Sequence, residues 1–198
     1  MVRRLIHEAE RADPTVFTVG HSTRAIEEFR ELLEAHEVKH LIDVRTVPRS
    51  RTNPQFNRDT LPERLKLAGI AYSHMPELSG LRHAKPDSRN TGWRNKSFRG
   101  YADYMQTTEF AKALEKLIAF ARKNQIAVMC AEAVPWRCHR SLIGDALLGR
   151  GIPVEHVMSS TRRDPHNLTP FAEARGTRVT YPSRQPGEQP GKQLSLLD

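Results

Sequence analysis

The sequence contains little cysteine, few aromatic residues and no long apolar run. With two cysteines among 198 residues, a framework of disulfide bonds is excluded, and a reducing cytoplasm is the expected location. No apolar stretch approaches the roughly 20 residues that a membrane-spanning helix needs, so we expect no membrane partner. Residues 1–8 contain arginines but no apolar segment follows them, which argues against a secretory signal.

Positive charge is abundant and unevenly placed. The chain has 31 Lys and Arg against 23 Asp and Glu, a formal net charge of +8. Such a balance favours anionic partners, including nucleic acid, nucleotides and phosphorylated metabolites. Residues 44–58 contain arginines and no acid, and residues 82–99 contain basic residues with a single acid, Asp87. Aromatic residues accompany the second segment, a mixture typical of proteins that bind phosphates and stack bases. Arg99 and Tyr101 are therefore candidate substrate-binding residues, and a solvated basic loop is the alternative.

Strand-like and helix-like segments alternate between residues 16 and 158, and the length suffices for one domain with a full core. The expected strands cover residues 16–19, 38–44, 70–75, 126–130 and 154–158. The expected helices cover residues 25–36, 61–67, 101–123 and 140–148. This alternation predicts an α/β fold: a single three-layer domain with a mostly parallel sheet and helices on both faces, Rossmann-like or flavodoxin-like. The site of such a fold lies beyond the carboxyl ends of the strands.

Two segments lack regular periodicity. Residues 76–98 read as a long loop, and from Thr161 onward proline and glycine become frequent. We therefore expect the α/β domain to span residues 1–160 and a flexible tail to span residues 161–198.

The end of the tail carries a short motif of its own. Residues 193–197, QLSLL, resemble the pentapeptide by which bacterial replication and repair proteins bind the DNA sliding clamp, with Leu197 in place of the usual aromatic residue. The resemblance implies that Gln193 would hydrogen-bond the rim of a pocket. It implies that Leu194, Leu196 and Leu197 would fill an apolar groove. The alternative is a tail that packs on its own domain.

Polar residues follow the first two expected strands. His21 and Ser22 follow the first strand. His21 can act as an acid or base, and Ser22 can donate a hydrogen bond to an anion. A helix cap beside a histidine is the alternative. Asp43 ends the second, where a carboxylate can orient a histidine, bind a metal or act as a base. The arginines that follow Asp43 offer planar forks for phosphate: Arg45, Arg49 and Arg51. An Asp–Arg pair that fixes a loop is the alternative reading of this second group.

The fourth expected strand leads into the most informative segment. Cys130 ends the strand, and Cys138 lies where the next helix begins. A thiol at a helix N-terminus with cationic neighbours has a stabilised thiolate, so Cys138 is a candidate nucleophile or redox thiol. The neighbours of Cys138 are Arg137, His139 and Arg140. The same N-terminus offers a seat for an anion, in which Arg137 and Arg140 would take part.

Other chemistries remain open for this segment. Zinc or iron can bind at Cys130, Cys138 and His139, completed by His21 or Asp43, since thiolate and imidazole suit both metals. The two thiols can instead cycle between dithiol and disulfide, or be partly buried structural groups. In an enzyme, His21 or His139 would transfer protons, and the carboxylate of Asp43 or Glu132 would orient that histidine.

Five ordered motifs resemble the domain-of-unknown-function family 488. They are TVGHS (18–22), DVRTVPRSR (43–51), NPQFN (53–57), WRNKSFRGYADYM (93–105) and MCAEAVPWRCHRSLI (129–143). The resemblance runs from about Val16 to Met158 and implies a compact cytoplasmic α/β protein; it supplies no reaction and no cofactor. The signature positions that it implies here are Gly20, His21, Asp43, Arg45, Pro48, Arg51, Cys130, Glu132, Cys138, His139 and Arg140.

Three functional hypotheses follow. The leading one is an enzyme or processing factor that acts on a phosphate-bearing substrate, such as nucleic acid, through a Cys/His/Arg site. The second is a non-enzymatic accessory of DNA maintenance that binds DNA through its basic loops and the sliding clamp through its tail. The third is a metal-dependent enzyme of small-molecule metabolism.

Overall fold

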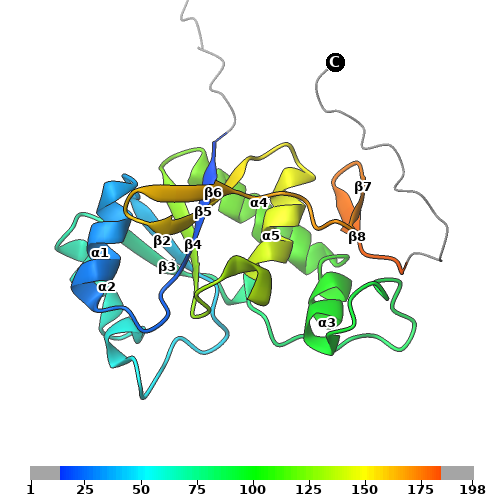
Figure 1. The fold of residues 1–198 in the computed structure, drawn as a ribbon, viewed down its shortest axis with the longest axis horizontal. Helices are drawn as coiled ribbons and strands as arrows, with labels where there is room; N and C mark the ends of the chain where they lie inside the picture. The colour runs from blue at the N-terminus through cyan, green and yellow to red at the C-terminus, as the bar shows by residue number, and fades with distance from the viewer. Residues whose placement is uncertain (1–13, 184–198) are drawn as a thin grey trace, which may run out of the picture.

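The computed structural model describes residues 14–183 and is built around a six-stranded sheet (Figure 1). The strands are β1 (Val16–Gly20), β2 (His40–Asp43), β3 (Ala71–His74), β4 (Ile126–Cys130), β5 (Val154–Ser159) and β6 (Arg162–Pro165). Their order in the sheet is β3-β2-β4-β1-β5-β6. Neighbours run parallel, except that β6 pairs antiparallel with β5.

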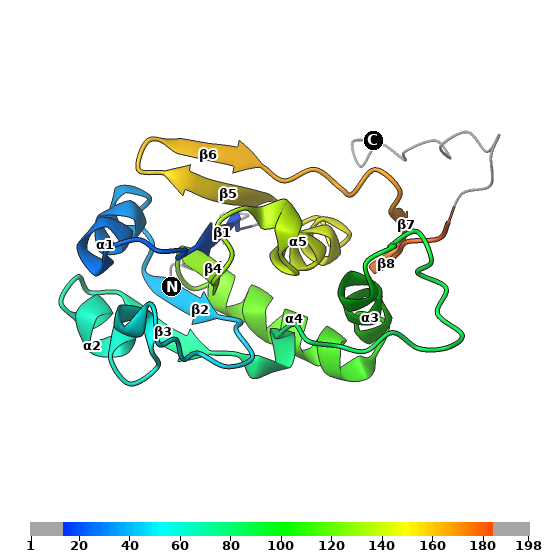
Figure 2. The ribbon, with the colours of Figure 1, turned by 60° about the horizontal axis from the view of Figure 1, so that its bottom comes forward.

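Helices cover both faces of this sheet, which Figure 2 shows from a second direction. The helices are α1 (Ile26–Ala35), α2 (Leu61–Lys66), α3 (Lys96–Tyr104), α4 (Thr108–Ala121) and α5 (Arg140–Leu148). One hydrophobic cluster joins α1 and α2 to Leu41 and Met129, and another joins α3, α4 and α5 to Ile42 and Val128. Successive strand residues point to opposite faces of the sheet. Leu41 and Met129 therefore lie in the core on one face, and Ile42 and Val128 lie in the core on the other. The predicted α/β domain with a mostly parallel sheet and helices on both faces is confirmed.

The carboxyl ends of β1, β2, β3 and β4 meet at one edge of the sheet. Gly20 is in register with Cys130, and Asp43 is in register with both Met129 and His74. Because β4 lies between β2 and β1, the thiol of Cys130 emerges between the other two strand ends. Short 3-10 helices follow β2, β3 and β4: η1 (Pro54–Phe56), η2 (Pro76–Leu78) and η3 (Pro135–Arg137).

The helix predicted over residues 101–123 is wrong in its limits. Two helices occupy this region, because α3 begins at Lys96 and ends at Tyr104 before α4 begins. Asn95 caps α3 by accepting from the backbone N–H groups of Ser97 and Phe98, and Thr107 caps α4 in the same way. Part of the predicted long loop is therefore helical.

The fold also continues past the predicted domain boundary at residue 160. Residues 161–183 contain β6 and a separate hairpin of β7 (Glu173–Arg175) and β8 (Arg178–Thr180). Tyr181 is fully buried in the core shared by α3, α4 and α5. The prediction that a flexible tail begins at residue 161 is thus wrong for residues 161–183, and the QLSLL motif lies outside the described residues. Within residues 14–183, no helix has the length and apolar character that crossing a membrane requires.

Candidate functional site

Asp43 and Arg45 form a buried ion pair at the end of β2. The Asp43 carboxylate accepts from the Arg45 guanidinium at 2.6 and 2.9 Å, and from the Arg45 backbone N–H at 3.0 Å. The hydroxyl of Tyr72 donates to the same carboxylate at 2.7 Å, and Arg45 also donates to the Phe56 carbonyl at 2.7 Å. Asp43 is 0% exposed and Arg45 is 6% exposed. The pair therefore joins β2, β3 and η1, and its guanidinium is not open to a substrate in this structure.

His21 belongs to the same buried network. Arg45 donates to Nε2 of His21 at 3.1 Å, so Nδ1 carries the ring proton and donates to the Ser22 carbonyl at 2.8 Å. The ring also stacks on Phe56, with centroids 4.2 Å apart. Burial lowers the pKa of His21 to about 4. At neutral pH the ring is therefore uncharged and both nitrogens are engaged, which suits a positioning role better than proton transfer.

Gly20 allows the loop after β4 to cross the end of β1. A Cβ atom at Gly20 would overlap the carbonyl oxygen of Glu132 and come within 2.9 Å of that of Ala133. Both carbonyls also accept from Nη2 of Arg140, at 2.6 and 3.4 Å. The close approach at Gly20 therefore shapes the loop that carries the chain from Cys130 to α5.

Arg140 is a buried cation at the first turn of α5. It is 1% exposed, and Nη1 donates to the hydroxyl of Thr18 at 3.4 Å. Within the described part of the chain, no carboxylate lies at ion-pair distance from it, and its Nε has no hydrogen-bond partner. A buried charge without a counterion is costly. The nearby thiol of Cys138 can supply the missing negative charge.

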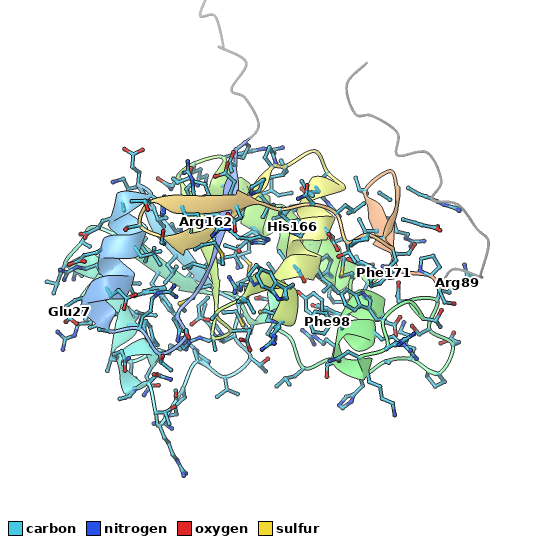
Figure 3. The ribbon with its side chains drawn as sticks, in the orientation of Figure 1. Glu27, Arg89, Phe98, Arg162, His166 and Phe171 are labelled. Carbon is cyan, nitrogen blue, oxygen red and sulfur yellow. The ribbon has the colours of Figure 1, made fainter. Side chains whose placement is uncertain are left out.

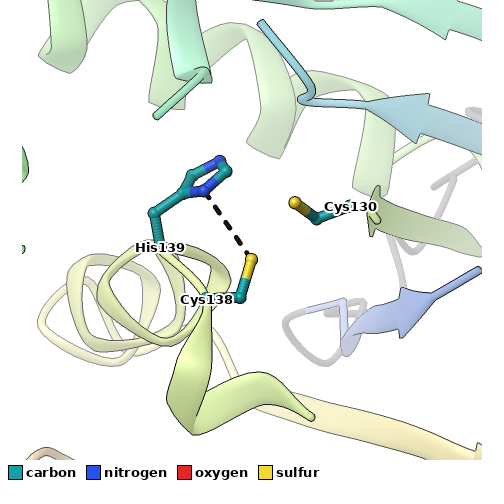
Figure 4. A group of neighbouring side chains, drawn as sticks. All are labelled: Cys130, Cys138 and His139. Carbon is teal, nitrogen blue, oxygen red and sulfur yellow. Dashed lines mark hydrogen bonds between the residues drawn. The ribbon is translucent and has the colours of Figure 1, made fainter. Parts of the chain in front are cut away.

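Cys130, Cys138 and His139 come together at the junction of β4 and α5 (Figure 4). The two sulfurs and one imidazole nitrogen all lie within 4.8 Å of one another, and Nδ1 of His139 is 3.6 Å from the sulfur of Cys138. Cys138 is 4% exposed, whereas Cys130 and His139 are partly exposed. Both cysteines are free thiols.

The two thiols are electrostatically unequal. The S–H of Cys130 hydrogen-bonds to the Cys138 sulfur, which lowers the pKa of Cys138 to about 6, and the charge of Arg140 acts in the same direction against the effect of burial. The same hydrogen bond, together with burial, raises the pKa of Cys130 to about 12. The pair therefore favours a thiolate on Cys138 with the proton kept on Cys130.

The remaining candidate residues are spread over the loops of this edge. Tyr101 is buried, donates to the Leu78 carbonyl at 2.8 Å and lies 5.1 Å from the His139 ring. Arg99 donates to the Trp93 carbonyl at 2.9 Å. Ser22 is partly buried, and the exposed candidates are Arg49, Arg51, Glu132 and Arg137. Arg49 also lines a shallow hollow of about 440 Å³ with Pro48, Arg58 and Asp59.

A second polar network, which no sequence motif indicated, lies beside α5. His156 contacts Thr18 at 2.7 Å and His166 at 3.0 Å, and His166 contacts the Asp145 carboxylate at 2.9 Å. Asp145 also accepts from the hydroxyls of Thr169 and Tyr181. These residues come from β1, α5, β5 and the segment after β6, so no local motif marks them.

Comparison with models of protein families identifies the family of the chain. The profile of a family described as "Domain of unknown function DUF488" matches residues 25–147. The chain belongs to this family. The matched range of DUF488 includes the cysteine cluster, the Asp43–Arg45 pair and most of α5, whereas the TVGHS motif lies before it. No curated protein and no solved structure gave a significant match.

The DUF488 arrangement offers two kinds of chemistry at the cysteine cluster. A thiolate beside a thiol, an imidazole and a buried arginine can act as a nucleophile. Two thiolates and an imidazole can also hold a zinc or iron ion, with a further position left for water or substrate.

Proposed function

We propose that this DUF488 protein is a thiol-dependent enzyme that acts on a phosphate-bearing substrate, with Cys138 as its nucleophile. The observation that carries the proposal is the buried guanidinium of Arg140, which has no carboxylate partner among the described residues and lies beside Cys138. A thiolate there neutralises a charge that would otherwise be costly to bury.

The neighbouring groups supply the remaining requirements of such a reaction. The Cys138 sulfur would form a bond to the electrophilic atom of the substrate while that atom's bond to the leaving group breaks. Cys130 or His139, which lie within 4.8 Å of the Cys138 sulfur, would give the leaving group a proton. Water would then release the product and restore the thiolate. Because Cys138 is buried, the substrate would approach from the partly exposed side of Cys130 and His139.

The charge around the edge favours an anionic substrate. Arg49, Arg51 and Arg137 are exposed on loops that follow β2 and β4. Guanidinium groups recognise phosphate with paired hydrogen bonds. This supports a phosphate-bearing substrate, and nucleic acid is one such class.

Alkylation with iodoacetamide, followed by mass spectrometry, tests the nucleophile. We expect Cys138 to react as a thiolate already near neutral pH, and Cys130 to stay unmodified. Hydrolysis of p-nitrophenyl phosphate and bis(p-nitrophenyl) phosphate should then fall to background in Cys138→Ser. Alkylation of Cys138 no faster than that of an ordinary thiol, or an unchanged rate in Cys138→Ser, would refute the proposal.

A metal centre is the second candidate, supported by a different observation. The Nε2 atom of His139 is buried without a hydrogen-bond partner in the described chain, and the cluster presents three ligand atoms. Zinc or iron would then be held by Cys130, Cys138 and His139. Metal analysis of protein purified without chelator separates the candidates. Stoichiometric zinc or iron that is lost in both Cys130→Ser and Cys138→Ser favours the metal centre and excludes a free thiolate.

A further inference from the structure

A cavity of about 450 Å³ borders the loop that leads to Cys138. It is lined by η3, by the start of α5, by β5 and β6, and by the segment that follows β6. Pro135 and Trp136 of η3 form part of its wall, and Ser141 forms another part. Neither Cys130, Cys138 nor His139 lines it. The cavity is therefore a separate site that shares one loop with the cysteine cluster.

Three large aromatic side chains form part of the wall of this cavity: Trp93, Trp136 and Phe171. Trp93 and Phe171 meet edge to face with centroids 4.9 Å apart, and Trp93 also packs against Phe98. Figure 3 labels His166 and Phe171, which line the cavity, and Phe98 of α3, which does not. Trp136 lines the cavity from the other side and is 64% exposed. A large apolar ring held open to solvent at a cavity wall marks a contact surface for a ligand.

The histidines of the cavity have no free polar atoms for a ligand. Arg140 must donate to Thr18, and the Asp145 carboxylate must accept from His166. One direction of donation satisfies every group between them: Arg140 to Thr18, Thr18 to His156, His156 to His166, and His166 to Asp145. Both rings are then held in fixed orientations. They present ring surfaces to the cavity, which suits an occupant that stacks.

Each tryptophan of the wall is followed in the chain by an arginine that does not itself line the cavity. Both tryptophans of the chain line this cavity, and each is followed directly by an exposed arginine, Arg94 after Trp93 and Arg137 after Trp136. An indole offers a face for a planar ring, and the neighbouring guanidinium offers a fork for phosphate. The volume falls within the range of about 300–1,000 Å³ that is usual for small-ligand sites.

We propose that this cavity binds a nucleotide, with the base stacked against Trp136 and the aromatic wall and the phosphate held by Arg94 and Arg137. The nucleotide is either free or the end of a single strand of nucleic acid, because the recognised chemistry is the same. Binding does not require a reactive Cys138, so this inference stands apart from the proposed thiol chemistry.

Intrinsic fluorescence tests the site directly, because the only two tryptophans of the chain line it. The probes are AMP, adenosine, ribose phosphate and a short oligo(dA) strand. We expect a saturable change in fluorescence with AMP or oligo(dA), binding of adenosine at least about tenfold weaker, and no change with ribose phosphate. Saturation by AMP identifies a free nucleotide as ligand, whereas saturation by oligo(dA) alone identifies a strand end.

Substitutions at the exposed positions locate the ligand. Trp136→Ala should weaken binding about tenfold, as expected for the loss of one stacking partner, while Trp136→Phe should retain most of the affinity. Arg137→Ala should weaken the binding of AMP but not the binding of adenosine. Leu81→Ala is the matched control, because Leu81 is an apolar side chain, 77% exposed, on another loop.

Two results would overturn the inference: no saturable binding of either AMP or oligo(dA) at millimolar concentration, or an affinity that Trp136→Ala leaves unchanged. Cys138→Ser keeps the test independent of the thiol chemistry. Nucleotide binding that persists in Cys138→Ser supports the cavity even if Cys138 proves unreactive. Failure of the cavity leaves the alkylation result untouched.

Discussion

His21 and His156 are held neutral by burial and by fixed hydrogen bonds. The pKa of each ring is lowered to about 4, with burial as the largest cause. In the unfolded chain both would titrate near their ordinary value of about 6.5. Between these values the unfolded chain binds protons that the folded protein does not. The stability that the two neutral histidines contribute is therefore fully present above about pH 6.5. It is lost as the pH falls toward about 4.

Removing one of these rings should flatten the pH dependence of stability. Protonation of each histidine should lower the free energy of unfolding by on the order of 3 kcal/mol between about pH 6.5 and about pH 4. Urea unfolding at about pH 7 and about pH 5 should show a smaller difference for His21→Gln than for the wild type. Glutamine can still donate and accept hydrogen bonds, so the fold should survive. An unchanged difference would mean that His21 has the same pKa in the folded protein as in the unfolded chain.

The S–H of Cys130 and, after it, the charge of Arg140 lower the pKa of Cys138, whereas Arg137 is exposed on η3. Arg140→Lys retains a charge but loses the planar fork that binds the Glu132 carbonyl at 2.6 Å and the Thr18 hydroxyl. We expect the alkylation of Cys138 to titrate at a higher pH in Arg140→Lys and at the wild-type pH in Arg137→Lys. Because both variants keep a positive charge, alkylation at the same pH in Arg140→Lys as in Arg137→Lys would show that the planar fork of Arg140 does not stabilise the thiolate.

At the scale of elements, the loop between β4 and α5 depends on its contact with the end of β1. Gly20→Ala would drive a methyl group into the Glu132 and Ala133 carbonyls. We expect it to lower the free energy of unfolding by about 2–3 kcal/mol, as overpacking does elsewhere. Displacement of the same carbonyls would also disturb Arg140 and slow the alkylation of Cys138.

Gly69→Ala is the control for this substitution, with the free energy of unfolding measured in urea. Gly69 has a φ of +68° with no atom within 4 Å of an added Cβ, so only backbone strain of about 1 kcal/mol is expected. Equal losses for the two variants would mean that the loop moves aside at Gly20.

Element boundaries depended on capping residues that the periodic pattern obscured. Asn95 and Thr107 are both favourable cap residues, yet the apolar positions on either side of Thr107 read as one continuous helix. The apolar run Ile126–Cys130 was predicted correctly, because four of its five residues are buried in the centre of a parallel sheet.

At the scale of the whole molecule, the segment after β6 anchors the core through Tyr181. Its hydroxyl donates to the buried Asp145 carboxylate at 2.8 Å, and its backbone N–H donates to Asn90 at 2.9 Å. Tyr181→Phe should cost about 1–3 kcal/mol in urea unfolding, because a buried carboxylate loses a donor. Tyr104→Phe, which removes a hydroxyl that donates to a carbonyl nearer the surface, should cost less. Equal costs would argue against the Asp145 contact.

The QLSLL motif remains a prediction about partners. If residues 193–197 bind a bacterial sliding clamp, the full chain should bind it with micromolar affinity, and a chain lacking residues 193–198 should not. Calorimetric titration of both forms would decide this. Equal affinity of the two forms, or no binding by either, would remove the clamp from the list of partners and leave the basic loops as the candidate surface for nucleic acid.

The sequence alone determined the alternation of strands and helices, the edge at which polar residues collect, and the pairing of Cys138 with a helix start, because these depend on local periodicity and on residue types close together in the chain. Tertiary structure alone decided that Asp43, Arg45 and His21 satisfy one another in the interior, that Arg140 lacks a carboxylate partner among the described residues, and that Trp93 and Trp136 line one cavity. Strand order and side-chain burial set those contacts, and both arise from packing between segments that are distant in the sequence.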